Sequence, residues 1–153
     1  MSNSASSQAT VSTIDLGRRG EELAAAYLQQ IGYSLVASNF NLPVGRNRNG
    51  ALVKVEIDLV AYEGDVLCFV EVKTRASDWF AAPSANVDLR KQRQITRAAR
   101  AYRKTFGLID TAYRYDVVSI VLPSANEAER DVELELFRGF WNEEKFRKHR
   151  WTG

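Results

Sequence analysis

The stretch ALVKVEIDLVAYEGDVLCFVEVKTR, residues 51–75, decides the fold. Two runs rich in apolar and β-branched residues flank a short glycine-containing segment, residues 63–65, and this arrangement predicts a β-hairpin. Because alternate side chains of a strand point to opposite faces, the second strand has one purely apolar face. Its other face is apolar at first and becomes charged at Glu71 and Lys73, near the end of the strand.

The pair Glu71 and Lys73 has two interpretations, an ion pair on an exposed face or part of an active site. The hairpin turn brings Asp58 of the first strand opposite residues 69–71. Two carboxylates from neighbouring strands can chelate a hard cation such as Mg²⁺ or Mn²⁺, and a lysine beside them can stabilise a phosphoryl transition state. Burying such charges without partners is unfavourable, which favours a site, although an exposed sheet face would remove that penalty as well.

Around this hairpin, periodicity and turn residues predict the other elements and a mixed β-sheet flanked by helices, in the order α-β-β-β-α-β-β-α. A segment rich in Asn, Gly and Arg, residues 41–50, reads as a loop. The expected helices span residues 16–31, 88–106 and 141–151, and the remaining strands span residues 34–40, 113–122 and 131–137.

The helix expected over residues 88–106 has a candidate core stripe and strongly basic remaining faces. The stripe consists of Leu89, Gln92, Ile95, Ala99 and Tyr102. Its basic residues fit either contacts with nucleic-acid phosphates or a solvated face, and the sequence leaves both open. They are Arg90, Lys91, Arg93, Arg97, Arg100, Arg103 and Lys104.

Length and composition limit the class of protein. The 153 residues, 45% hydrophobic and 26% charged, suit one domain over residues 15–140, with a disordered tail over residues 1–14 and a C-terminal helix or tail over residues 141–153. The net charge of +2 permits nucleic-acid binding without requiring it. No apolar run is long enough to span a membrane, so we expect a cytoplasmic protein.

Cysteine and histidine are too scarce for several kinds of site. One cysteine, Cys68, excludes an intramolecular disulfide and reads as a small core residue. One histidine, His149, argues against a Ser-His-Asp triad or a multi-histidine zinc site. Hydrolytic chemistry in this chain would therefore use carboxylates, lysine and a hard metal ion.

Four motifs together resemble a known family: GRRGEELAAAYLQQIGY at residues 17–33, EIDLVA at 56–61, FVEVKTR at 69–75 and YDVV at 115–118. They are similar to the YraN-like family of bacterial proteins, which is related to archaeal Holliday junction resolvases within the PD-(D/E)xK nuclease superfamily. The resemblance implies an α/β fold with a restriction-endonuclease-like core.

The resemblance also assigns roles to residues. Asp58 is the motif aspartate, Glu71 and Lys73 are the E-x-K pair, and Glu21 is the helix glutamate of the G-x-x-G-E motif, which completes the site. Asp58, Glu71 and Glu21 would then bind the metal, and Lys73 and Glu21 would assist catalysis. Independently of the resemblance, Glu56 is expected to point to the face opposite Asp58 if the strand is regular, and it is left out of the ligand set.

Two features depart from the family pattern. Val55 stands where the family usually has glycine before EIDL. The preceding segment NLPVGRNRNGALVK, residues 41–54, is longer than usual and basic. Such an insert either holds a phosphate or only lengthens a hairpin.

These observations lead to a metal-dependent, structure-selective DNA endonuclease as the first hypothesis, acting on branched DNA as a homodimer with Mg²⁺ or Mn²⁺. Arg18, Arg19, Arg75 and Lys91 are the expected DNA contacts. Trp79 and Phe80, in the loop after Arg75, either stack on bases or anchor that loop to the core. A DNA-binding module without catalysis and a protein-interaction adaptor are the alternatives.

Overall fold

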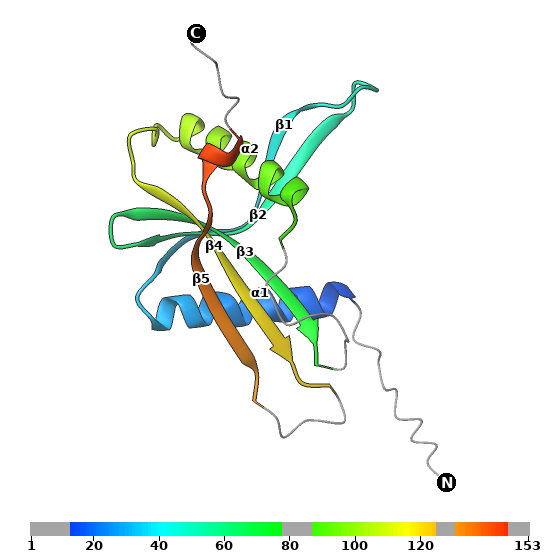
Figure 1. Ribbon diagram of the computed structural model, residues 1–153, viewed down its shortest axis with the longest axis vertical. Coiled ribbons are helices and arrows are strands. Elements are labelled where there is room, and N and C mark those ends of the chain that lie inside the picture. Colours follow the sequence, from blue (N-terminus) through cyan, green and yellow to red (C-terminus); the bar gives the residue numbers. More distant parts are fainter. Residues whose placement is uncertain (1–12, 78–86, 125–130, 147–153) are drawn as a thin grey trace.

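A five-stranded mixed sheet with a helix on each face forms the protein (Figure 1), as the sequence predicted. The computed structural model describes residues 13–77, 87–124 and 131–146. The elements are α1 (Thr13–Gln30), β1 (Ser34–Arg46), β2 (Leu52–Glu63), β3 (Val66–Ala76), α2 (Leu89–Thr105), β4 (Tyr113–Leu122), β5 (Glu133–Trp141) and the short 3₁₀ helix η2 (Glu143–Phe146). Among the described helices, none is long and apolar enough to cross a membrane.

The strands lie in sequence order across the sheet, β1-β2-β3-β4-β5. All neighbours are antiparallel except β3 and β4, which are parallel and connected through α2. A parallel pair needs a long crossover, and the segment containing α2 supplies it. The pairing of β2 with β3 runs from Glu63–Val66 to Leu59–Val70, so Asp58 lies directly beyond its last pair.

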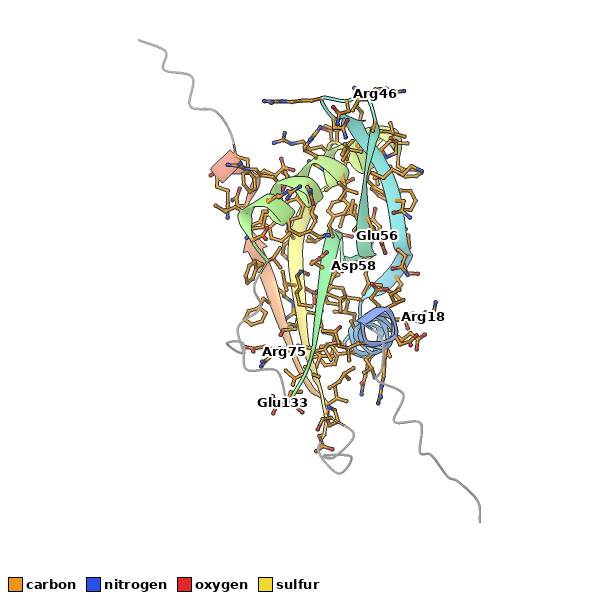
Figure 2. All side chains as sticks on the ribbon, turned by 90° about the vertical axis from the view of Figure 1, so that its right-hand side faces the viewer. Arg18, Arg46, Glu56, Asp58, Arg75 and Glu133 are labelled. Carbon is orange, nitrogen blue, oxygen red and sulfur yellow. The ribbon has the colours of Figure 1, made fainter. Side chains whose placement is uncertain are left out.

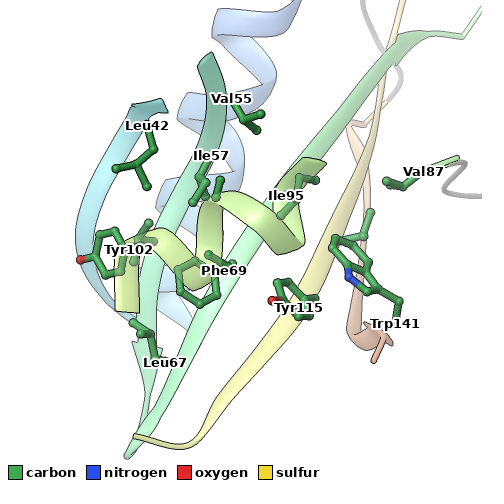
Figure 3. Close-up of a cluster of buried hydrophobic side chains, with 14 residues drawn as sticks. Leu42, Val55, Ile57, Leu67, Phe69, Val87, Ile95, Tyr102, Tyr115 and Trp141 are labelled. Atoms are coloured by element: carbon green, nitrogen blue, oxygen red, sulfur yellow. The ribbon is translucent and has the colours of Figure 1, made fainter. Parts of the chain in front are cut away.

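Each face of the sheet has its own apolar core. On one face, Phe69 of β3 packs with Ile95 and Tyr102 of α2 (Figure 3). On the other, Cys68 and its neighbours on β3 pack with residues of α1. Because β3 is covered on both faces, its sequence is nearly continuously apolar up to Glu71. The prediction that Cys68 is a core residue is confirmed.

The predicted loop over residues 41–50 is wrong, because β1 and β2 form one long hairpin that continues through it. Pairing extends to Arg46 and Leu52, which leaves only a short turn. Asn47 orders this turn, since its side-chain oxygen accepts hydrogen bonds from the backbone N–H groups of Asn49 and Ala51, each at 3.0 Å. Leu42 of β1 packs in the core beneath α2. The surrounding Asn, Gly and Arg residues hid the alternation of buried and exposed side chains that marks this segment as a strand.

Helix boundaries account for the other differences. The first helix begins at Thr13, so it includes the last two residues of the predicted tail. Leu89 is 54% exposed and does not belong to the core stripe, because it is the first residue of α2, whereas the other four predicted members are buried. The helix predicted from residue 141 begins later, because Trp141 ends β5 and the short 3₁₀ helix η2 starts at Glu143. Trp79, Phe80 and residues 147–153 lie outside the described residues.

Candidate metal site

The alternation of β2 breaks at Asp58. Ile57 packs in the core on the α2 side, whereas Leu59, two residues later, packs in the core on the α1 side. On β1, Asn39 lies between the residues that pair with Ile57 and Leu59, and its φ of 50° is in the left-handed region, which asparagine tolerates better than most residues. Both strands thus change faces at the same level, and Asp58 lies at the point of change.

Asp58 also connects β2 to β3 where the backbone pairing has ended. Its Oδ2 atom accepts a hydrogen bond of 2.8 Å from the backbone N–H of Val72. The carboxylate therefore takes the place of a strand partner for this N–H group. The bond holds Asp58 beside Glu71, the residue that precedes Val72, so the hairpin does bring these two predicted ligands together.

Glu71 is buried without a full set of partners. Its side chain is 5% exposed, and Oε1 lies 3.8 Å from Nζ of Lys73 and 3.9 Å from Nζ of Lys91. Oε2 is buried and has no hydrogen-bond partner. Burial and the nearby charge of Asp58 raise the pKa of Glu71 to about 8, against the opposing effect of the two lysines.

A divalent cation fits this arrangement. Buried carboxylates normally have each oxygen hydrogen-bonded or ion-paired, because an uncompensated buried charge is unfavourable. Here one oxygen of Glu71 lacks a partner, and the neighbouring carboxylate of Asp58 makes ionisation harder. A hard cation that shares oxygens of both residues would remove both penalties, and oxygen donors are the ligands that Mg²⁺ and Mn²⁺ prefer.

A second group of carboxylates shares Asp58. Ligand oxygens of Glu21, Glu56 and Asp58 all lie within 4.8 Å of one another, close enough to hold a metal ion (Figure 2 labels Glu56 and Asp58). Burial and the charges of Asp58 and Glu56 raise the pKa of Glu21, while a hydrogen bond with Asn39 lowers it. The expectation that Glu56 points away from Asp58 is wrong, because carboxylate oxygens of both residues lie in this group.

A glycine brings Glu21 to the sheet. At Gly20, α1 passes so close to β3 that an added Cβ would overlap Oγ1 of Thr74 and lie 2.8 Å from its Cβ. Only glycine permits this approach, and the next residue, Glu21, lies beside Glu56 and Asp58 in the middle of β2. The close contact gives a physical reason for the second glycine of the G-x-x-G-E motif. Glu22 is exposed, so Glu21 is the glutamate that faces the sheet.

The four predicted DNA contacts occupy different positions. Lys91 lies at the acidic site, beside Glu71. Arg18 and Arg19 are exposed on α1. Arg75 lines a separate hollow of about 230 Å³ together with Glu133 and Glu135 of β5. Figure 2 shows Arg75 and Glu133 at one end of the sheet, away from Asp58. The contacts of these four residues with DNA remain predictions. The position of Lys91 beside Glu71 could not be predicted from the sequence, because the periodicity of a helix does not indicate which strand each of its residues approaches.

Comparison with known proteins finds one family. The sequence model of "Uncharacterised protein family UPF0102" matches residues 20–120, a range that contains Glu21, Glu56, Asp58, Glu71, Lys73 and Lys91. A UPF0102 protein of Chlorobium chlorochromatii is 44% identical over 117 residues, 76% of this chain and 82% of that protein. One of Geobacter sulfurreducens is 43% identical over 109 residues, 71% of this chain and 77% of its own length.

Proposed function

The chain belongs to the uncharacterised protein family UPF0102, and on that premise we propose that it is a divalent-metal-dependent DNA endonuclease of the PD-(D/E)xK type. One observation carries the proposal: Glu71, buried and with an unpaired oxygen, lies between a second carboxylate, Asp58, and the half-exposed amine of Lys73. The family resemblance supplies branched DNA as the substrate and a homodimer as the active form.

Asp58 and Glu71 would hold Mg²⁺ or Mn²⁺, and Glu21 and Glu56 would hold a second ion or its bound waters. A bound ion of this kind supplies a water of lowered pKa and neutralises charge on a phosphoryl oxygen. Val72 fixes Asp58 through the hydrogen bond from its N–H, so the carboxylate is oriented before any ligand arrives. Such preorganisation is a large part of how active sites stabilise transition states.

The two lysines have different parts in this proposal. The side chain of Lys73 is 41% exposed, so its ammonium can reach a phosphate oxygen or the attacking water from the solvent side. Lys91 approaches Glu71 from α2 and balances its charge, which keeps the carboxylate available for the metal. Lys73 is therefore the candidate catalytic lysine, and Lys91 is a positioning residue.

Calorimetric titration with Mn²⁺ tests the metal site before any substrate is known. Binding should be lost in Asp58→Ala and Glu71→Ala, because each variant removes one of the two carboxylates that would coordinate the ion. Glu133→Ala is a matched control, since it removes an exposed carboxylate from β5 and should bind as wild type does. Equal Mn²⁺ affinity in wild type and Asp58→Ala would overturn the metal assignment.

Cleavage of a synthetic four-way junction tests the activity. Wild type should cut it with Mg²⁺ or Mn²⁺, and Lys73→Ala should keep Mn²⁺ affinity while the rate falls by about 10²–10³, the usual effect of losing one transition-state donor. The non-catalytic module predicts salt-dependent junction binding with no cut under either metal. The adaptor predicts no DNA binding even at low salt.

Sedimentation with and without junction DNA examines the expected homodimer. A four-way junction has approximate two-fold symmetry, so a symmetric dimer would present two sites to two strands. A monomer that cuts the junction at full rate would contradict the proposed homodimer and leave the endonuclease activity supported.

A further inference from the structure

The long β1–β2 hairpin is a candidate interaction surface that the site does not use. We call residues 41–54 the arm, which comprises the end of β1, the turn and the start of β2. Figure 1 shows the hairpin extending past α2, away from the rest of the sheet. Figure 2 shows Arg46 at its far end, with Glu56 and Asp58 nearer the middle of the molecule.

The arm is held in one orientation at its base. The register between β1 and β2 shifts between Pro43 and Gly45, which makes Val44 the extra residue of a β-bulge. A bulge leaves its extra residue outside the normal pairing. Arg97 of α2 donates a hydrogen bond to the carbonyl of Val44, so the helix fixes the bulge and the direction in which the arm leaves the sheet.

Its tip is ordered as well. Nη1 of Arg46 donates a hydrogen bond of 2.8 Å to the carbonyl of Gly50, and the backbone N–H of Asn47 donates one of 2.9 Å to Ala51. An ordered tip loses less conformational entropy on binding than a flexible loop would. Its exposed cations are thus presented at a fixed distance from the site.

The charged side chains of the arm are all positive. Residues 34–55 contain no aspartate or glutamate, and neither do residues 89–105 of α2. A surface that only needs solubility usually mixes both signs, whereas a single-sign field attracts a polyanion. The exposed cations of the arm are Arg46, Arg48 and Lys54.

The length of the arm sets a spacing. From Leu52 to Asp58 the strand advances six residues, which at about 3.3 Å each is roughly 20 Å. Successive phosphates along one strand of B-DNA are about 3.4 Å apart along the helix axis, so this reach corresponds to roughly six base pairs. The tip lies slightly beyond that point.

We infer that the arm is a second DNA-contact site, which binds the phosphate backbone of duplex DNA roughly six base pairs from the phosphate at the proposed metal site of Asp58 and Glu71. This inference rests on the proposed function for its substrate. Arginine suits the role because its planar guanidinium binds phosphate through paired donors. The tip, residues 46–50, has no aromatic residue to stack on bases, so the contact reads position along the duplex and not its sequence.

The test combines an arm variant with a scan of neutralised phosphates. Arg48→Gln/Lys54→Gln removes two exposed charges of the arm, and thermal unfolding and Mn²⁺ titration should match wild type. Lys104→Gln, near the C-terminal end of α2, removes an exposed charge outside the arm. Binding is measured by fluorescence anisotropy on four-way junctions of constant length, in which short windows of phosphates are replaced in turn by neutral methylphosphonates.

For wild type and Lys104→Gln, we expect one window to lower affinity by about 3–10-fold, the range that one or two phosphate contacts contribute. In the arm variant the same window should have no further effect, and the slope of log affinity against log salt should fall by about 2. If wild type cuts the junction, that window should lie roughly six base pairs from the cut.

An arm variant that binds with wild-type affinity and salt slope would overturn the inference, as would a variant that responds to every window as wild type does. Absence of cleavage would count against the proposed function alone, because the scan reads binding. Cleavage at full rate with an unchanged scan would count against the arm alone.

Discussion

The hairpin formed by β2 and β3 has a carboxylate near each end, and the two carboxylates differ in how fully they are hydrogen-bonded. At the turn end, Glu63 accepts hydrogen bonds of 2.8 Å from Arg114 and 2.7 Å from Arg138. At the other end, Oε2 of Glu71 has no partner, and it is the one buried carboxylate oxygen without a hydrogen bond in the part of the chain that the structure describes.

Two aspartates make the same contrast. Asp116 is fully buried, yet it accepts hydrogen bonds from Arg114, from the hydroxyl of Tyr33 at 2.9 Å and from the N–H of Gly139 at 3.0 Å. Asp58 has one such bond, from Val72, and lies beside three other carboxylates. The paired end stabilises the fold, whereas the unpaired end stores an electrostatic penalty that a bound cation would relieve.

The largest effect on stability should come from the paired end. Arg114→Met leaves Asp116 buried without its cation, and removing one member of a buried pair typically destabilises a fold by about 3–5 kcal/mol. Urea denaturation should show the loss, while Mn²⁺ affinity of the folded protein stays near that of wild type. A loss of unfolding free energy below about 1 kcal/mol would mean that the hydrogen bonds from Tyr33 and Gly139 are enough to stabilise the buried carboxylate of Asp116.

Next in size is the contact between α1 and β3. Gly20→Ala forces the helix away from Thr74 and should lower the free energy of unfolding by about 1–3 kcal/mol, the usual effect of overpacking. It should also weaken Mn²⁺ binding, because Glu21 moves with the helix. Gly17→Ala is the matched control in the same helix, since nothing lies within 4 Å of its added Cβ. It should be neutral or slightly stabilising. Unchanged metal affinity in Gly20→Ala would remove Glu21 from the site.

A smaller effect of opposite sign is expected for Glu71→Gln. The folded pKa of Glu71 is raised to about 8 from a usual 4.5, so the metal-free fold loses stability as pH rises between these values. An amide cannot ionise, and at pH 9 the variant should be more stable than wild type by about 1–2 kcal/mol while losing Mn²⁺ binding. Thermal unfolding at pH 5 and pH 9 measures the difference, and a variant less stable at both would contradict it.

The smallest effect should be the reverse pH dependence of Glu63. Hydrogen bonds from Arg138 and Arg114 lower the pKa of Glu63 to about 2, so its stabilisation is complete above about pH 4.5 and is lost as pH falls toward 2. Glu63→Gln should be less stable by about 1 kcal/mol at pH 7, a value reduced for partial exposure, and should lose less stability than wild type on acidification. Parallel acid titration curves for the two proteins would refute the assignment.

Local pattern explains which features could be predicted. Alternating apolar residues gave the β2–β3 hairpin, and helical spacing gave α1 and most of the buried face of α2. Glu56 was placed on the wrong face, and spacing alone could not settle its position because the alternation of β2 breaks at Asp58. The arm was missed because its turn-forming residues are dispersed along real strands, where pairing with β2 outweighs local preference.

The sequence by itself determined the order of elements, the hairpin and the pairing of Asp58 with the neighbourhood of Glu71, because all of these follow from periodicity and a short turn. Only the tertiary structure decided that Glu21 and Lys91 meet this hairpin, since each depends on how closely a helix packs on the sheet. It also decided which carboxylates are paired, because Arg114 and Arg138 reach Glu63 from strands far away in the sequence.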